Sequence, residues 1–226
     1  MDLTSVTALH SSDQLPCWHP GDAWLAGGTW LFSQPQPDVT RLLDLTGLGW
    51  PALTERSDGL EIAATCTIAE LAGWRCPPQW AAGPLIRRCC QAFLASFKIW
   101  NAATVGGNLC TGLPAGPMIS LTAALGGTAE IWSPDGARRC LPVAELVTGP
   151  GRTRLGPGDL LRSIKLPATT LTSPTAFRQA SLRNGGRSAA LLIGRRDAVG
   201  DVSVAAGSLI ERSRSPGPSR VRPGPV

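Results

Sequence analysis

Short apolar runs that end at glycine or at turn residues predict a fold rich in short strands. Apolar and polar residues alternate within several of these runs, as expected for half-buried strands. Two of them flank Asp135-Gly136, a turn sequence that predicts a β-hairpin. The predicted strands are residues 23–26, 41–45, 59–64, 129–132, 139–142 and 159–167, and a new unit opens with residues 176–180 and the apolar run 189–193.

Three segments predict helices. Residues 84–97 have apolar side chains three and four positions apart, which predicts one helix that begins near Pro84. Thr67 and Glu70 form a capping-box pattern, so a short helix is expected to begin there. Residues 118–125 are apolar and predict a packed helix that Gly126-Gly127 ends. The mixture of short strands and helices indicates the α+β (α/β) fold class.

The 226 residues divide into four segments by pattern and composition. Residues 1–55 are expected to form an N-terminal α/β subdomain, and residues 56–170 a second α/β subdomain. Residues 171–208 begin a further unit that stops too soon to complete a domain. Residues 209–226 are rich in Ser, Arg, Pro and Gly and are expected to be disordered, because they offer almost nothing apolar to bury.

Composition and charge exclude several classes of function. Hydrophobic residues make up 43% of the chain and charged residues 16%, which is typical of a globular protein. The formal net charge is +5, but residues 211–226 hold four arginines and one glutamate, so 4 − 1 = +3 of it lies in the tail. The rest of the chain is nearly neutral and shows no basic face with stacking aromatic residues. We therefore expect no nucleic-acid partner.

The seven cysteines and two histidines do not form a recognisable metal or disulfide pattern. No C-x-x-C pair is present, which argues against a zinc or iron–sulfur site, and the odd number argues against a secreted disulfide framework. His10 and His19 have no acidic or cysteine cluster beside them, so no metal site is expected. The N-terminus lacks a signal-peptide pattern and no segment reaches the roughly 20 apolar residues of a membrane span, so a cytoplasmic location is expected.

Two glycine segments carry the candidate chemistry, Leu-Ala-Gly-Gly-Thr at residues 25–29 and Thr-Val-Gly-Gly-Asn at residues 104–108. Glycine lets the backbone turn with a positive φ and lets its N–H groups approach a phosphate without an intervening Cβ. Neither segment matches a P-loop or a Rossmann fingerprint. Together they could hold both phosphates of a dinucleotide, and no side chain is expected to act as an acid, base or nucleophile.

The two glycine segments belong to a series of six segments that follow one another in a family-specific order. The series resembles the FAD-binding (medium) subunit of the molybdopterin dehydrogenases, such as xanthine dehydrogenase and carbon monoxide dehydrogenase. This resemblance implies a PCMH-type FAD-binding domain of two α/β subdomains, followed by a truncated C-terminal α/β unit. The matching segments are residues 25–29, 60–71, 101–109, 142–146, 160–167 and 176–181.

The resemblance implies FAD as the cofactor and places its binding residues. The two glycine segments would bind the pyrophosphate, and Leu161 would contact the adenine side. Arg178 stands where the family often has Lys, and a cation there would favour an anionic or reduced flavin. Leu94 stands where some relatives place an aromatic side chain near the cofactor. The implied cofactor-binding residues are Trp24, Leu25, Ala26, Gly27, Gly28, Thr29, Trp30, Leu31, Thr104, Val105, Gly106, Gly107, Asn108, Leu161 and Arg178.

The resemblance also implies a function and partners. Such a subunit is part of an oxidoreductase, in which electrons pass from the iron–sulfur clusters of a small 2Fe-2S subunit through FAD to NAD or another acceptor. The substrate is oxidised in a large molybdopterin-binding subunit. Pro117 stands where the family commonly has an Asp that reaches FAD, so that contact is expected to be absent. The alternatives are a flavin-free assembly subunit of the same complex and, less in keeping with the matches, a flavoenzyme that acts alone.

Overall fold

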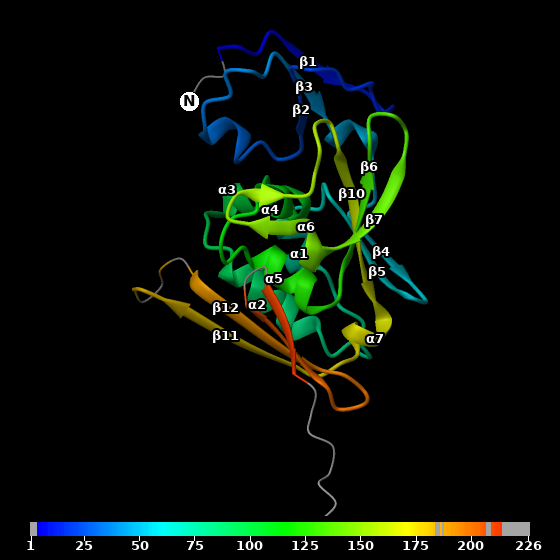
Figure 1. Cartoon of the computed structure of the whole chain (residues 1–226), viewed down its shortest axis with the longest axis vertical. Coiled ribbons are helices and arrows are strands. Elements are labelled where there is room, and N and C mark those ends of the chain that lie inside the picture. The colour runs from blue at the N-terminus through cyan, green and yellow to red at the C-terminus, as the bar shows by residue number, and fades with distance from the viewer. Residues whose placement is uncertain (1–3, 184–185, 187, 207–208, 214–226) are drawn as a thin grey trace, which may run out of the picture.

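The computed structural model describes residues 4–183, 186 and 188–206 and the backbone of 209–213. It contains a small sheet at the N-terminus, a five-stranded sheet covered by helices, and a C-terminal antiparallel sheet on the other side of those helices (Figure 1). Helices and strands are thus mixed, as the sequence predicted. In the part of the chain that is described, no helix has the length and apolar character needed to cross a membrane.

The N-terminal sheet is parallel and has the strand order β1, β3, β2. It consists of β1 (Ala8–Ser11), β2 (Asp22–Leu25) and β3 (Arg41–Asp44). Two 3-10 turns follow β2 and β3, η1 (Leu31–Ser33) and η2 (Thr46–Leu48). The strands predicted at residues 23–26 and 41–45 are confirmed, whereas β1 was not predicted because all four of its residues are exposed and show no buried alternation.

The central sheet is antiparallel and has the strand order β4, β5, β10, β6, β7. The strand β10, at the centre of this sheet, pairs with β5 on one side and β6 on the other, although about 100 residues separate it from β5 in sequence. The strands are β4 (Leu53–Arg56), β5 (Gly59–Ala63), β6 (Thr128–Trp132), β7 (Arg138–Pro142) and β10 (Leu160–Pro167). The predicted hairpin at Asp135-Gly136 is confirmed as the β6–β7 connection.

Helices pack on this sheet and bury the main hydrophobic core between them. Leu60, Ile131 and Ile164 of the sheet and Leu121 of α5 are all fully buried in it. Every residue of α5 is buried, because the C-terminal sheet covers its other side. The helices are α1 (Ile68–Gly73), α2 (Gly83–Ala92), α3 (Phe97–Trp100), α4 (Val105–Thr111), α5 (Pro117–Ala124), α6 (Val143–Leu146) and α7 (Ala168–Leu171), with a small hairpin of β8 (Val147–Gly149) and β9 (Arg152–Thr153).

The C-terminal sheet is a meander of β11 (Thr175–Ser181), β12 (Ser188–Arg196), β13 (Val202–Ala206) and β14 (Leu209–Ser213). The disorder expected from residue 209 onward is therefore corrected for residues 209–213, whose backbone pairs with β13. Backbone hydrogen bonds form this edge strand, and composition alone does not reveal them. Residues 214–226, the remainder of the predicted tail, lie outside the described residues.

The helix predicted over residues 84–97 is shorter than expected. The helix α2 ends at Ala92, and α3 is a separate turn that begins at Phe97. The indole N–H of Trp100 donates to the Phe93 carbonyl oxygen at 2.9 Å, which holds the break between the two helices. Phe97 is 74% exposed and Leu94 is also exposed, so neither continues the buried face of α2.

The capping box predicted at Thr67 is confirmed and gives a test of local stability. The Glu70 N–H donates to the Thr67 hydroxyl, and the Thr67 N–H donates to the Glu70 carboxylate. Thr67→Ala is expected to lower the free energy of unfolding by about 1 kcal/mol, because the α1 N–H groups lose an acceptor. Urea unfolding of the full chain measures this. Thr172→Ala, whose hydroxyl only donates to the Thr169 carbonyl, is the control, and an equal loss in both would contradict the prediction.

Candidate cofactor site

A cavity of about 800 Å³ lies where the N-terminal sheet meets the helix-covered central sheet. One wall is formed by the end of β2 and the segment after it, residues 24–31. The opposite wall is formed by α4, by the first residues of β10 and by the segment between α2 and α3. The cavity falls within the usual size range of small-molecule and cofactor pockets, and residues far apart in sequence line it.

The first glycine segment supplies free main-chain donors to this cavity. Gly28 has φ of +66°, a conformation that favours glycine. Among the described residues, none of the N–H groups from Gly27 to Trp30 donates to a protein acceptor. All four residues line the cavity. Successive unpaired N–H groups at a turn form a concavity that suits an anion such as a phosphate.

Gly27 also fixes how closely the two walls approach. A Cβ at this position would overlap the carbonyl oxygen of Ala102, which belongs to the segment just before α4. The N-terminal unit therefore touches the rest of the chain at a point where only glycine fits. The sequence predicted that Gly27 lets backbone N–H groups come close to a ligand. The structure adds that Gly27 lets the N-terminal unit pack against Ala102.

The second glycine segment differs from the predicted loop. Gly106 and Gly107 lie in the first turn of α4, which Thr104 caps. The Val105 and Gly106 N–H groups donate to the Cys66 and Ala64 carbonyl oxygens, at 2.8 and 3.0 Å. The N–H groups of Gly107 and Asn108 donate to the hydroxyl and the carbonyl oxygen of Thr104. The expectation of free backbone donors is thus corrected for this segment, because long-range acceptors bind the first two N–H groups and Thr104 binds the other two.

Asn108 connects the second glycine segment to the next helix. Its Oδ1 accepts the Met118 N–H at 3.1 Å, in the first turn of α5. This bond leaves the amide nitrogen of Asn108 as a donor on a residue that lines the cavity. Pro117 begins α5 and also lines the cavity, so the position where the family commonly has a carboxylate presents a proline ring instead.

Asp159 is the one charged residue among the described cavity-lining residues, and its charge is already balanced. Burial alone would raise the pKa of Asp159, but hydrogen bonds from Ser133, from the Gly156 N–H and from Arg139 together hold this pKa below its usual value. The carboxylate therefore serves to fix the turn before β10. The described wall offers main-chain and neutral side-chain donors to an anion, and no lysine or arginine.

The structure places most of the predicted site residues together. Residues 24–31, Thr104, Gly106, Gly107, Asn108 and Leu161 all line the cavity. Val105 is fully buried in the hydrophobic core and does not. Arg178 lies on β11 as an exposed residue outside the lining, and its guanidinium donates to the Phe177 carbonyl oxygen.

Sequence reasoning missed several lining residues. Phe93 and Ile99 lie on either side of the break between α2 and α3. The apolar spacing predicted one continuous helix here, so a role of these residues in the cavity was not expected. Leu160 precedes the predicted contact Leu161 on β10 and lines the same wall. Asp159 gave no signal, because its partners Ser133 and Arg139 are distant in sequence.

Comparison with known proteins identifies a family for most of the chain. The FAD binding domain in molybdopterin dehydrogenase matches residues 2–169. Xanthine dehydrogenase of Oryza sativa subsp. japonica is 29% identical over 52% of this chain and 9% of its own length. Caffeine dehydrogenase subunit beta of Pseudomonas sp. (strain CBB1) is 32% identical over 46% of this chain and 36% of its own length. The match thus spans about a third of the caffeine dehydrogenase subunit and a smaller part of the plant enzyme.

Solved structures confirm the fold. Quinoline 2-oxidoreductase from Pseudomonas putida 86 superposes with a TM-score of 0.73, over 94% of this chain and 77% of that chain, at 21% identity. The mixed α+β fold expected from the sequence is therefore that of this group of proteins. Since the matched family covers three quarters of the sequence, the chain belongs to the FAD binding domain family of the molybdopterin dehydrogenases, and FAD is its cofactor.

Proposed function

We propose that this chain is the FAD-binding electron-transfer subunit of a molybdenum hydroxylase. It would pass electrons from the iron–sulfur clusters of a small 2Fe-2S partner subunit through FAD to NAD or another acceptor, while a large molybdopterin-binding subunit oxidises the substrate. The observation that carries this proposal is the row of unpaired N–H groups from Gly27 to Trp30 in a cavity of cofactor size, within a family match to an FAD domain. A cytoplasmic location belongs to the same proposal.

The residues of the cavity suggest how FAD would be held. The N–H groups of Gly27 to Trp30 would bind the pyrophosphate, with the Asn108 amide nitrogen as a further donor. Leu160 and Leu161 provide an apolar surface for the adenine side. FAD supplies the redox chemistry when bound, and the chain binds, orients and shields it. Arg178 is outside this proposal, because it does not line the cavity.

The proposed division into subdomains follows the sheets except at its boundary, which falls within β4 (Leu53–Arg56), a strand that pairs with β5 in the antiparallel sheet. Residues 1–55 would form the first subdomain, around the parallel sheet, and residues 56–170 the second, around the antiparallel sheet. Residues 171–208 would begin the C-terminal unit, whose first strand starts at Thr175. In this arrangement FAD would lie between the first two subdomains, since residues from both line the cavity.

A flavin-free assembly subunit of the same complex is the second candidate. Two observations favour it: the described cavity wall carries no lysine or arginine to balance a pyrophosphate, and the N–H groups at the start of α4 are already bonded. Pro117 adds to this, because no carboxylate reaches the cavity from that position. Such a subunit would dock its partners without taking part in electron transfer.

Flavin content separates the two candidates. The full chain, purified alone and after coexpression with large and small subunits of a molybdenum hydroxylase, is expected to carry a stoichiometric amount of FAD that acid denaturation releases. Absorbance and chromatography of the released flavin measure it, and rapid mixing with NADH or NAD tests whether that cofactor exchanges electrons with the chain. A folded chain that lacks flavin in both preparations and takes up none from solution would support the assembly role instead.

A further inference from the structure

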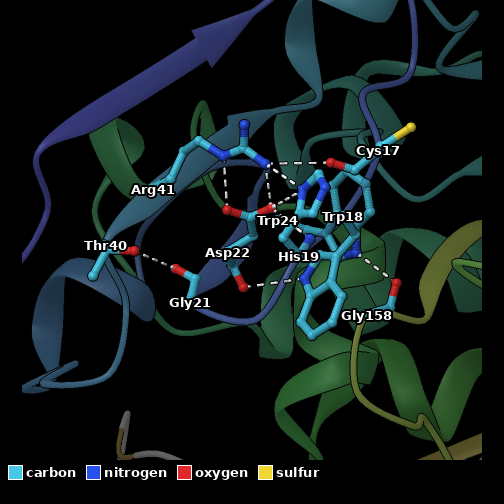
Figure 2. Close-up of polar contacts among 9 residues, drawn as sticks. All are labelled: Cys17, Trp18, His19, Gly21, Asp22, Trp24, Thr40, Arg41 and Gly158. Carbon is cyan, nitrogen blue, oxygen red and sulfur yellow. Dashed lines mark hydrogen bonds and ion pairs between the residues drawn. The ribbon is translucent and has the colours of Figure 1, made fainter.

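One hydrogen bond joins the N-terminal unit to the rest of the described chain. Of residues 4–49, only Trp24 forms a hydrogen bond with a described residue beyond position 49. Its indole N–H donates to the Gly158 carbonyl oxygen at 3.0 Å, as Figure 2 shows. Because the cavity lies between these two parts, this bond and the close packing at Gly27 set its width.

A second tryptophan packs at the same glycine. Gly158 has φ of +77°, and a Cβ there would lie 2.7 Å from the Trp18 ring and 2.6 Å from Pro134. Trp18 and Trp24 thus converge on Gly158 from the N-terminal unit (Figure 2). Gly158 precedes Asp159 and β10, whose first residues form the opposite cavity wall.

Asp22 connects the segments that carry both tryptophans. Its carboxylate accepts hydrogen bonds from Arg41 Nε at 2.7 Å and from the His19 N–H at 2.7 Å, and its main-chain oxygen accepts the Trp18 indole N–H at 3.1 Å. Arg41 lies directly opposite on β3, so its second nitrogen also reaches the carboxylate. The hydrogen bond from Arg41 is the main reason that the pKa of Asp22 lies below its usual value.

Asp22 lies outside the cavity, and its side chain is buried. Its side chain is 4% exposed, and it is not among the cavity-lining residues. It begins β2, the strand that carries Trp24 and leads into the Gly27–Trp30 donors. Loss of its charge would leave the Arg41 guanidinium without its anion and weaken the acceptor of the His19 N–H, in the segment that carries Trp18, so β2 and this segment would be held less firmly and both tryptophans would lose support.

We propose that Asp22 is a positioning residue for FAD, which, paired with Arg41, holds Trp18 and Trp24 against Gly158 and so sets the spacing between the two cavity walls. This inference rests on the proposed function, in that the cavity binds FAD. Asp22 acts through the tryptophans and contacts no part of the cofactor.

The first test compares the FAD affinity of two variants of the full chain. Asp22→Asn is expected to weaken FAD binding by about tenfold, because an amide cannot replace the ionic pair with Arg41. Flavin fluorescence during titration of the flavin-free protein measures this. Glu61→Gln is the matched control, since Glu61 also pairs with an arginine across a strand pair, Arg56, but far from Gly158; its affinity is expected to equal that of the wild type.

A double-mutant cycle distinguishes positioning from general loss of stability. Trp24→Phe removes the indole donor to Gly158, and adding Asp22→Asn to it is expected to weaken FAD binding little further, because both changes act on one connection. Additive losses in affinity, or a folded Asp22→Asn variant with wild-type affinity, would overturn the inference.

A readout without FAD tests the connection itself. In the flavin-free wild type, the Trp24 indole N–H is expected to exchange with solvent slowly, and in Asp22→Asn much faster, as followed by NMR of the indole protons. Equal protection in both proteins would overturn the positioning role. A wild type that shows the slow exchange but binds no FAD would instead sink the proposed function, so the two failures are distinguishable.

Discussion

Gly27→Ala is expected to weaken FAD binding by on the order of a hundredfold, which would be among the largest effects of any single methyl group in this chain. The added Cβ would overlap the Ala102 carbonyl oxygen. The backbone fixes the position of the Cβ, and the Ala102 oxygen is main chain, so neither atom can rotate away. The segment after β2 must then move, and the N–H groups of Gly27 to Trp30 move with it. Titration of the flavin-free full chain with FAD measures the affinity.

Gly73→Ala is the control for this substitution. Gly73 ends α1, and a Cβ there would meet nothing within 4 Å. Alanine also has a higher helix propensity than glycine, so wild-type FAD affinity and equal or slightly greater stability are expected. Wild-type affinity in Gly27→Ala would show that the contact with Ala102 does not position the donors.

Gly106→Ala is expected to lower the free energy of unfolding by about 3 kcal/mol, at the upper end for an overpacked site. Its Cβ would lie 2.5 Å from the Ala64 Cβ and 2.6 Å from the Ala64 carbonyl oxygen. That same oxygen accepts the Gly106 N–H, so a shift to relieve the clash also lengthens this bond. Urea unfolding with an unchanged denaturant dependence, monitored by tryptophan fluorescence, would report the loss.

Gly107→Ala provides the comparison within the same helix turn. A Cβ at Gly107 would approach only the Thr104 hydroxyl, at 3.0 Å, and alanine gains helix propensity. Its loss of stability is expected to stay below about 1 kcal/mol, since the two effects oppose each other. Equal destabilisation of both variants would mean that α4, rather than its contact with Ala64, is sensitive to the substitution.

Local signals in the sequence were sufficient for many elements of the fold but not for their arrangement. Alternation and turn residues predicted β5, β6, β7 and β10, and the Thr67–Glu70 pair predicted the start of α1. The insertion of β10 between β5 and β6 depends on pairing across about 100 residues, which no local pattern encodes. The edge strand β1 was missed because all four of its residues are exposed, and β14 because composition does not reveal its backbone pairing with β13.

The same distinction applies to the candidate site. The first glycine segment was predicted as a turn with available N–H groups, a property of the local chain, and the structure has it. The second segment was predicted in the same way, but its Val105 and Gly106 N–H groups find acceptors on Cys66 and Ala64, which are distant in sequence. Whether Arg178 reaches the cavity depends on the path of β11, which the local sequence does not specify.

The free N–H groups of Gly27 to Trp30 have a consequence for how such a site evolves. Every residue other than proline carries the same amide group, so in the proposed site the side chains of Ala26 or Thr29 can change while the donors stay in place. Selection would then act on backbone shape, through the few glycines that no other residue can replace. The 29% and 32% identity to two relatives leaves room for such changes of side chain.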